Sequence, residues 1–282
     1  MYAADLLAGK TILVTGGGSG LGKAMALRFA ELGADIGVLG RRTGPLEEVC
    51  GEVRAMGRKA AWASTDVRDA AAVDAAFTKI EDELGPLTGL VNNAAGNFLA
   101  PSEDLSPNAF DAVVRIVLHG TFHCTQAFGK RCIARGSGGD VLSITTTYSW
   151  MGSAFVLPSA CAKAGVHVMT RSLAVEWATY GIRLNSIAPG PFPTEGAFSR
   201  LMPKGIEEAA MKGIPLQRFG EPPELANLAV YLMSPGAAYV TGENVVIDGG
   251  EWLKKGQEFS SFTDCPREQL KQMLSAMKPK KG

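Results

Sequence analysis

The stretch VTGGGSGLG, residues 14–22, decides the fold of this chain, because it joins an apolar run to a helical pattern through closely spaced glycines. Gly16, Gly20 and Gly22 follow the spacing T-G-x-x-x-G-x-G. Glycines here permit a tight turn, let backbone amides approach a pyrophosphate, and let helix pack on strand. A merely tight turn would also explain a lone glycine motif, but the strand before it and the helix after it favour a dinucleotide site. The predicted cofactor contacts in this stretch are Gly16, Gly18, Ser19, Gly20, Leu21 and Gly22.

Short apolar runs alternate with helical patterns along the rest of the chain. Helices are predicted over 21–32, up to about Gly57, over 70–83 and 108–134, from Pro158, and after Pro223. The predicted strands are KTILVT (10–15), DIGVLG (35–40), KAAWAST (59–65), LTGLVNN (87–93), DVLSIT (140–145), GIRLNSIA (181–188) and NVVIDG (244–249). Such runs, apolar on both faces and alternating with helices, are typical of a parallel sheet covered on both sides. The sequence therefore predicts an α/β fold with a doubly wound, Rossmann-type parallel sheet of about seven strands.

The 282 residues suit one large α/β domain, and no linker or repeat divides them. We therefore expect a single dinucleotide-binding oxidoreductase domain over residues 1–282. Residues 190–222 are rich in Gly and Pro and interrupt the alternation. A long irregular insertion in a compact domain is more often functional than decorative, so we expect a substrate lid there.

Composition argues against several function classes. Lys plus Arg and Asp plus Glu both number 28, so no charge excess favours nucleic acid or an anionic membrane. No apolar run approaches the ~18 residues of a membrane span, and no signal or transit peptide is expected at the amino terminus. The five cysteines are scattered without a C-x-x-C pair, which suits a reducing compartment and a cytoplasmic location. His119 and His123 lie four apart, but no carboxylate or cysteine set completes a site, so no metal is predicted.

The end of the second predicted strand selects between the two nicotinamide cofactors. An NAD site usually places an acid there for the ribose hydroxyls. This chain has LGRRT instead, with Arg41 and Arg42 where a 2′-phosphate would lie. Because guanidinium groups match phosphate bidentately, the pattern favours NADP(H), although both arginines could also be ordinary surface charges.

These motifs together resemble the short-chain dehydrogenase/reductase family over nearly the whole chain. The matching segments are TGGGSGLG, Asp66–Val67, NNAAG at 92–96, Lys163 in the helix from Pro158, and PG at 189–190. The resemblance implies that Asp66 binds adenine and that Lys163 holds the nicotinamide ribose. The further cofactor contacts that it implies are Val67, Asn93, Ala94, Ala95, Pro189, Gly190, Pro191 and Phe192.

Three residues depart from the usual pattern of that family. The usual tyrosine is Ser159, the usual catalytic serine falls at Thr146, and the place of the family's asparagine falls at Val117. The segments NNAAGNF, TTTY, PSACAKAG, PGP and GAFSR instead resemble one branch, the NADPH-dependent 2,4-dienoyl-CoA reductases in their mitochondrial-type form. That resemblance implies a homotetramer built on the two long helices. It implies the catalytic residues Tyr148 and Asn97, with Lys163 on the cofactor, and the acyl-CoA contacts Arg68, Phe98, Ser106 and Arg200. Ser159 lies one helical turn before Lys163 and is a further catalytic candidate, which either touches substrate or fills the space left by the missing ring.

A physical reason supports a displaced tyrosine. When a dienoyl thioester takes hydride at its far end, charge develops on the thioester oxygen, several bonds away. Stabilising groups must face the atom where charge develops. Tyr148 and Asn97 both follow predicted strands, whose carboxyl ends meet at the ligand-binding edge of an open sheet. The competing interpretation is that Tyr148 packs in a loop and Asn97 caps a turn.

The leading hypothesis is therefore NADPH-dependent reduction of 2,4-dienoyl-CoA in the oxidation of unsaturated fatty acids. Two alternatives stay open at this point. The chain could be a carbonyl or enoyl reductase with another substrate, which the intact Lys163 permits, or an NADP-binding protein without turnover, which the loss of the ordinary tetrad permits.

Overall fold

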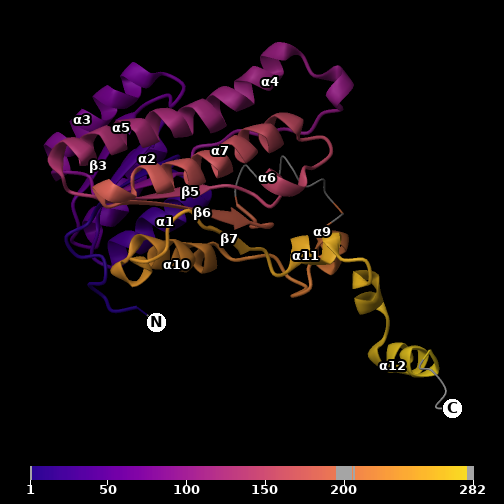
Figure 1. Cartoon of the computed structure of the whole chain (residues 1–282). Coiled ribbons are helices and arrows are strands. Elements are labelled where there is room, and N and C mark those ends of the chain that lie inside the picture. Colours follow the sequence, from indigo (N-terminus) through magenta and orange to yellow (C-terminus); the bar gives the residue numbers. More distant parts are fainter. Residues whose placement is uncertain (1, 195–204, 206, 278–282) are drawn as a thin grey trace.

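The computed structural model describes residues 2–194, 205 and 207–277, and its centre is a seven-stranded sheet with helices on both faces (Figure 1). The strand order is β3-β2-β1-β4-β5-β6-β7, and every neighbouring pair is parallel. The strands are β1 Thr11–Thr15, β2 Asp35–Gly40, β3 Ala60–Ser64, β4 Gly89–Asn92, β5 Gly139–Ile144, β6 Ile182–Pro189 and β7 Asn244–Ile247. The order reverses between β1 and β4, which makes the doubly wound arrangement that the sequence predicts.

Two layers of helices cover the sheet (Figure 1). One layer holds α1 Gly20–Glu31, α2 Thr43–Ala55 and α10 Pro222–Met233. The other holds α3 Ala70–Leu84, α5 Gly120–Arg135 and α7 Leu157–Glu176. The remaining α-helices are α4 Pro107–Val114, α6 Tyr148–Met151, α9 Glu207–Lys212, α11 Glu251–Gly256 and α12 Arg267–Ala276.

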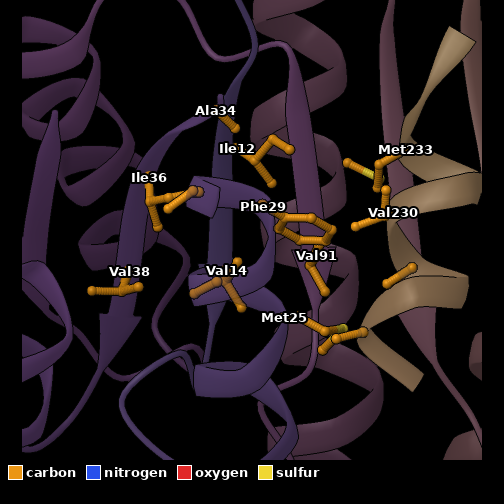
Figure 2. Packing of buried hydrophobic residues seen from close by; sticks show 14 of the residues in the cluster. Ile12, Val14, Met25, Phe29, Ala34, Ile36, Val38, Val91, Val230 and Met233 are labelled. Atoms are coloured by element: carbon orange, nitrogen blue, oxygen red, sulfur yellow. The ribbon is translucent and has the colours of Figure 1, made fainter. Parts of the chain in front are cut away.

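The core under α1 and α10 is made of strand side chains that meet helix side chains (Figure 2). Ile12 and Val14 of β1 and Phe29 of α1 are fully buried, and Val230 of α10 packs in the same cluster. Burial of each such side chain contributes about 1.5–3 kcal/mol relative to leaving it in water. The apolar runs that predicted strands buried on both faces are therefore the residues that build this core.

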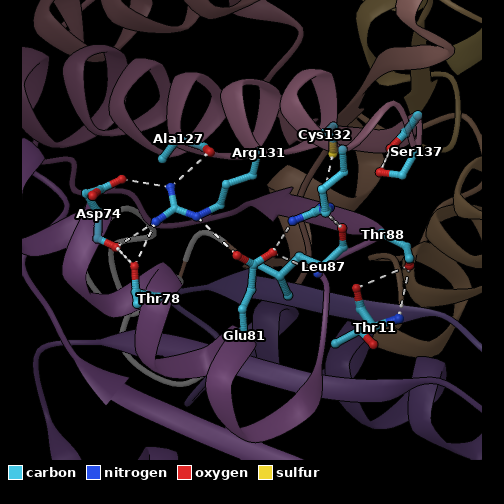
Figure 3. Close-up of polar contacts among 12 residues, drawn as sticks. Thr11, Asp74, Thr78, Glu81, Leu87, Thr88, Ala127, Arg131, Cys132 and Ser137 are labelled. Atoms are coloured by element: carbon cyan, nitrogen blue, oxygen red, sulfur yellow. Dashed lines mark hydrogen bonds and ion pairs between the residues drawn. The ribbon is translucent and has the colours of Figure 1, made fainter.

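Charged side chains join α3 to α5 on the opposite layer (Figure 3). Arg131 lies 2.7 Å from Asp74 and 3.1 Å from Glu81, and Arg135 lies 2.7 Å from the other oxygen of Glu81. Glu81 is only 17 % exposed, so these pairs are screened less than ordinary surface pairs. The network holds the two helices in register over one face of the sheet.

The helical elements differ from the sequence predictions at several places. The helix predicted over 108–134 contains a π-helical turn, Arg115–His119, between α4 and α5. Tyr148, expected in a strand-end loop, opens the short helix α6. The segment 190–222, expected to be irregular, includes α9, and helices α11 and α12 beyond the last strand were not predicted. In Figure 1, α12 lies apart from the body.

Within the described part of the chain, we find no helix with both the length and the apolar character needed to cross a membrane.

Candidate active site

A cleft of about 830 Å³ opens at the carboxyl edge of the sheet, where the strand order reverses. Open α/β sheets bind their ligands at this point, because the loops after neighbouring strands diverge there. The segments that follow β1, β2, β3, β4, β5 and β6 all contribute to its lining. The predicted site residues that line it are Gly16, Gly18, Ser19, Gly20, Leu21, Arg41, Arg42, Asp66, Val67, Asn93, Ala94, Ala95, Asn97, Tyr148, Ser159, Lys163, Pro189, Gly190 and Pro191.

The glycine turn leaves open the space that a dinucleotide backbone needs. Gly16 and Gly20 have φ angles of 65° and 54°, in the left-handed region that favours glycine. Gly22 lies outside the cleft lining and serves packing instead. A Cβ there would stand 2.4 Å from the Gly16 carbonyl oxygen and 2.5 Å from the Asn93 side chain. Each glycine of the motif therefore has a steric reason, as the sequence predicts.

We expect Gly22→Ala to lower the unfolding free energy by about 1–3 kcal/mol, because backbone must move to admit the methyl group. NADPH affinity should fall with it, since the turn that would hold the pyrophosphate is displaced. Gly51→Ala is the matched control: Gly51 lies in α2, and a Cβ there meets nothing within 4 Å. Chemical denaturation and calorimetric titration measure both effects. Equal stability of the two variants would contradict the packing role of Gly22.

Two free guanidinium groups stand at the end of the cleft beyond β2. Arg41 and Arg42 are exposed, and neither side chain forms an ion pair with any residue that the structure describes. Lys23 nearby, in contrast, is paired with Glu48 and Glu52 at 2.7 and 2.8 Å. The two arginines are therefore available to an anionic ligand.

Asp66 and Arg68 form a closed pair at the same end. The Arg68 guanidinium lies 2.5 and 3.0 Å from the Asp66 oxygens, and its hydrogen bond holds the pKa of that carboxyl below its usual value. Asp66 lines the cleft, as expected of an adenine contact, but Arg68 does not. The expected acyl-CoA contact at Arg68 is instead engaged with its neighbour two residues away.

Lys163 lies at the bottom of the cleft and is 7 % exposed. Its ammonium group donates to the Ile144 carbonyl at the end of β5. Burial lowers the pKa of Lys163 from 10.5 to about 8, because an ammonium group loses hydration in the protein interior. The lysine thus stays mostly charged at pH 7 and is positioned to donate a further hydrogen bond into the cleft.

This pKa predicts a pH dependence of stability. Between pH 8 and 10.5 the unfolded chain binds more protons at Lys163 than the folded chain, so stability rises with pH. Below pH 8 both states are protonated and the burial cost is constant. Relative to a Lys163→Met variant, the wild type should gain up to about 3 kcal/mol across that window. Denaturant titrations at several pH values measure it, and a flat difference would show that Lys163 has an ordinary pKa.

Three polar side chains form a chain of hydrogen bonds in the cleft. The Asn97 amide nitrogen donates to the Tyr148 hydroxyl at 3.4 Å, and that hydroxyl lies 3.1 Å from the Ser159 hydroxyl. Asn97 Oδ1 accepts from the Phe98 backbone N–H at 2.9 Å. Because an N–H can only donate, this bond orients the amide so that its nitrogen faces Tyr148. The side chains of Asn97 and Tyr148 therefore lie next to each other in the cleft.

Two loops that carry these groups are joined by their backbones. The Ala100 N–H donates to the Phe155 carbonyl at 3.0 Å, which links the loop after Asn97 to the loop before Ser159. Phe155 has a φ of 65°, a conformation that costs a bulky residue of order 1–3 kcal/mol. Strain of this size persists only where surrounding contacts determine the backbone, so this loop pair is held in a defined geometry.

Thr146 lines the cleft with a buried hydroxyl that has no hydrogen-bond partner among the described residues. This is the position at which the resembled family usually carries its serine. An orphaned polar atom, an open glycine turn and two unpaired guanidinium groups together match the needs of a phosphorylated dinucleotide. The residues present therefore fit such a cofactor.

Three further predicted contacts do not line the cleft. The Phe192 ring is buried against Gly220, where a Cβ would stand 2.4 Å from it, so this side chain serves the core. Phe98 packs against the cluster that includes Val117. Ser106 caps α4 by accepting from the Ala109 N–H. Arg200 lies outside the described residues. Phe98 and Ser106 can therefore contact only a part of a ligand that extends beyond the cleft.

Several lining residues were not foreseen from the sequence. Thr65 directly follows β3 and Thr147 lies three residues after β5, so the rule that ligands bind at strand carboxyl ends would have found them. Glu251 and Lys255 also line the cleft, from α11. No sequence signal marked these two, because their position depends on where a short terminal helix docks.

Comparison with known proteins agrees with this geometry. Residues 16–251 match the family model described as Enoyl-(Acyl carrier protein) reductase. A Bacillus subtilis protein named "Probable 2,4-dienoyl-CoA reductase" is 44% identical over 86% of this chain and 97% of its own. The "Peroxisomal 2,4-dienoyl-CoA reductase" of Arabidopsis thaliana is 37% identical over 98% of this chain and 93% of its own. A solved dehydrogenase structure from Agrobacterium tumefaciens, with NADP bound, has a TM-score of 0.82 and 34% identity, and the match covers 89% of this chain and 100% of that one.

Proposed function

Because this chain belongs to the short-chain dehydrogenase/reductase family, we propose from its cleft that it is an NADPH-dependent 2,4-dienoyl-CoA reductase. One observation carries the proposal: Asn97 and Ser159 both contact the hydroxyl of Tyr148, although the tyrosine usual for the family is missing from position 159. A hydrogen-bond donor for the substrate oxygen would thus be supplied from another element, α6. The relatives named 2,4-dienoyl-CoA reductases support the same substrate class.

The chain's own residues would divide the work as follows. The cofactor, when bound, supplies a hydride for the distal carbon of the diene. Lys163 and the glycine turn would hold that cofactor, with Lys163 near its ribose. Asn97 and Tyr148 would donate hydrogen bonds to the thioester oxygen, on which negative charge develops. The Tyr148 oxygen accepts from Asn97, and if Ser159 also donates to it, the tyrosine proton is left for the substrate. Ser159 would orient that hydroxyl, and water would protonate the dienolate carbon.

The cofactor preference follows from Arg41 and Arg42. We expect NADPH to bind roughly tenfold to a hundredfold more tightly than NADH, since a charge-assisted phosphate contact contributes about 1.5–3 kcal/mol. NADH is the matched control ligand for NADPH, because it lacks only the 2′-phosphate. Calorimetric titration of wild type and of an Arg41→Ala/Arg42→Ala variant measures the ratio. Should NADH bind as well as NADPH to the wild type, the arginines are not phosphate ligands.

A single assay tests the whole proposal. Protein is mixed with NADPH and a 2,4-dienoyl-CoA, and absorbance of the reduced nicotinamide is followed. Oxidation of NADPH with this substrate, and not with a simple ketone or a 2-enoyl-CoA, is the expected result. Turnover of the ketone or the enoyl thioester alone would favour another reductase of the family. Binding of NADPH without turnover of any of the three would favour a non-catalytic role.

We also propose that the protein is a homotetramer, built on α5 and α7. Phe122 of α5 and Val168 and Val175 of α7 are 45%, 63% and 80% exposed, which supports an interface on these helices. Analytical ultracentrifugation tests the assembly.

A cytoplasmic location is proposed from the cysteines, all five of which are free in the structure. Cell fractionation tests the location.

A further inference from the structure

Three aromatic rings connect the helix that carries Tyr148 to two other helices. Trp150, two residues after Tyr148 on α6, lies 5.9 Å from the His167 ring of α7, at an interplanar angle of 70°. It lies 5.5 Å from the Trp252 ring of α11, at 89°. Aromatic pairs prefer this edge-to-face geometry at centroid separations of 4.5–7 Å. Trp150 is therefore held by two oriented contacts.

The His167 side of this stack is rigid. Asn244 Oδ1 accepts hydrogen bonds from the hydroxyls of Thr145 and Ser186, both at 2.8 Å. These bonds turn the Asn244 amide nitrogen toward His167 Nδ1, at 3.2 Å. Since that nitrogen can only donate, Nδ1 accepts, and the imidazole is neutral. Burial lowers the pKa of His167 in the same sense. Ser149 of α6 also contacts Nδ1, at 3.4 Å.

The Trp252 side is anchored to the end of the sheet. Asp248, directly after β7, accepts from the N–H groups of Gly250 and Trp252, both at 2.8 Å. Asp248 packs so closely on Gly190 that a Cβ there would lie 2.6 Å from the Asp248 Cβ. The start of α11 is therefore tied both to β7 and to the segment that lines the cleft after β6.

Helix α6 needs such support, because it is only four residues long and no side chain caps its start. So short a helix has too few backbone hydrogen bonds to hold its own conformation. Its position must come from its packing, through Ser149 and Trp150. Trp252 supplies one of the two aromatic contacts of Trp150. Its helix, α11, starts at Glu251, which is the last residue that the family model matches.

We propose that Trp252 is a positioning residue for Tyr148. It holds Trp150, and thereby keeps α6 where the Tyr148 hydroxyl meets Asn97 and Ser159. The effect of Trp252 on turnover rests on the proposed function and on the role that it gives to Tyr148. The effect of Trp252 on the position of α6 does not. An error of about 1 Å in a catalytic group can cost on the order of a hundredfold in rate. Loss of the Trp252 ring should therefore slow the chemical step.

The experiment compares Trp252→Ala, Trp252→Phe and the control Leu253→Ala, whose side chain is a 46% exposed neighbour on α11. For Trp252→Ala we expect kcat with a 2,4-dienoyl-CoA to fall ~10- to 100-fold, with a smaller change in KM. The Kd for NADPH, measured by calorimetry, should stay within about twofold. Trp252→Phe keeps a ring edge toward Trp150 and should regain most of the rate. Leu253→Ala should match the wild type.

Hydrogen exchange supplies a readout that does not depend on the substrate. The Gly152 amide donates to the Tyr148 carbonyl at 3.1 Å and reports on α6. Its exchange should quicken about tenfold or more in Trp252→Ala, while the amides of α10 are unchanged. If the wild type does not reduce dienoyl-CoA, the proposed function fails and exchange alone decides this inference. Exchange in Trp252→Ala equal to that in Leu253→Ala would overturn it, as would an undiminished kcat. Should Trp252→Ala not fold, Trp252→Leu must show the same selective effects.

Discussion

We expect the Tyr148→Phe variant to lose about 10²–10³-fold in kcat for a 2,4-dienoyl-CoA while binding NADPH almost as tightly as the wild type. The substitution removes only the phenol oxygen, which is the atom that both Asn97 and Ser159 contact, and keeps the ring that packs. A donor that acts on charge developing in the transition state affects turnover more than substrate affinity. Steady-state kinetics with calorimetric NADPH titration separates the two quantities.

Ser159 provides the matched comparison. Ser159→Ala removes a partner of Tyr148 but leaves the Asn97 contact, so its loss should be much smaller. Ser159→Tyr should not rescue Tyr148→Phe, because a ring at position 159 must enter space that the Tyr148 side chain already reaches, 3.1 Å from the serine oxygen. If Ser159→Ala is the crippled variant and Tyr148→Phe is near normal, Tyr148 is a packing residue and the dienolate mechanism fails.

An equally large effect is expected for Asn97→Asp, on the order of 10³-fold or more in kcat at neutral pH. Aspartate is nearly isosteric and keeps the oxygen that accepts from the Phe98 N–H, so the turn at this position survives. The atom that faces Tyr148 changes from a donor to a carboxylate oxygen. A negative charge then stands where the thioester oxygen becomes negative, so the variant loses a stabilising contact and gains a repulsive one.

The pH profile of this variant distinguishes the mechanism from simple damage. Protonation restores a donor at position 97, so kcat of Asn97→Asp should rise as pH falls through the pKa of the new carboxyl group. Wild-type enzyme carries an amide at position 97 and should not share that rise. A variant that is impaired equally at all pH values, or that also loses NADPH affinity, would indicate a structural role for Asn97 instead.

The sequence was sufficient for the fold and for many of the residues that line the cleft after β1 and β2, for a local physical reason. The motif VTGGGSGLG can be interpreted without tertiary contacts. Positions 16, 20 and 22 must be glycine wherever a strand turns closely into a helix, for steric reasons. The apolar strands are short and buried on both faces, so alternation alone defines the parallel sheet. Arg41 and Arg42 follow the second strand directly, and strand ends meet at one edge of such a sheet.

Only the tertiary structure decided the rest, because the remaining features depend on contacts between distant segments. The sequence pattern indicated a loop at Tyr148. The structure has a short helix there, and Trp150 of that helix packs on His167 and Trp252. Phe192 was expected beside the nicotinamide, but the glycine that admits its ring into the core, Gly220, lies 28 positions later. The convergence of Asn97 on Tyr148 joins residues 51 apart in the chain. Spacing in sequence carries no information on such distances, because they are set by how α6, α7 and α11 dock on the finished sheet.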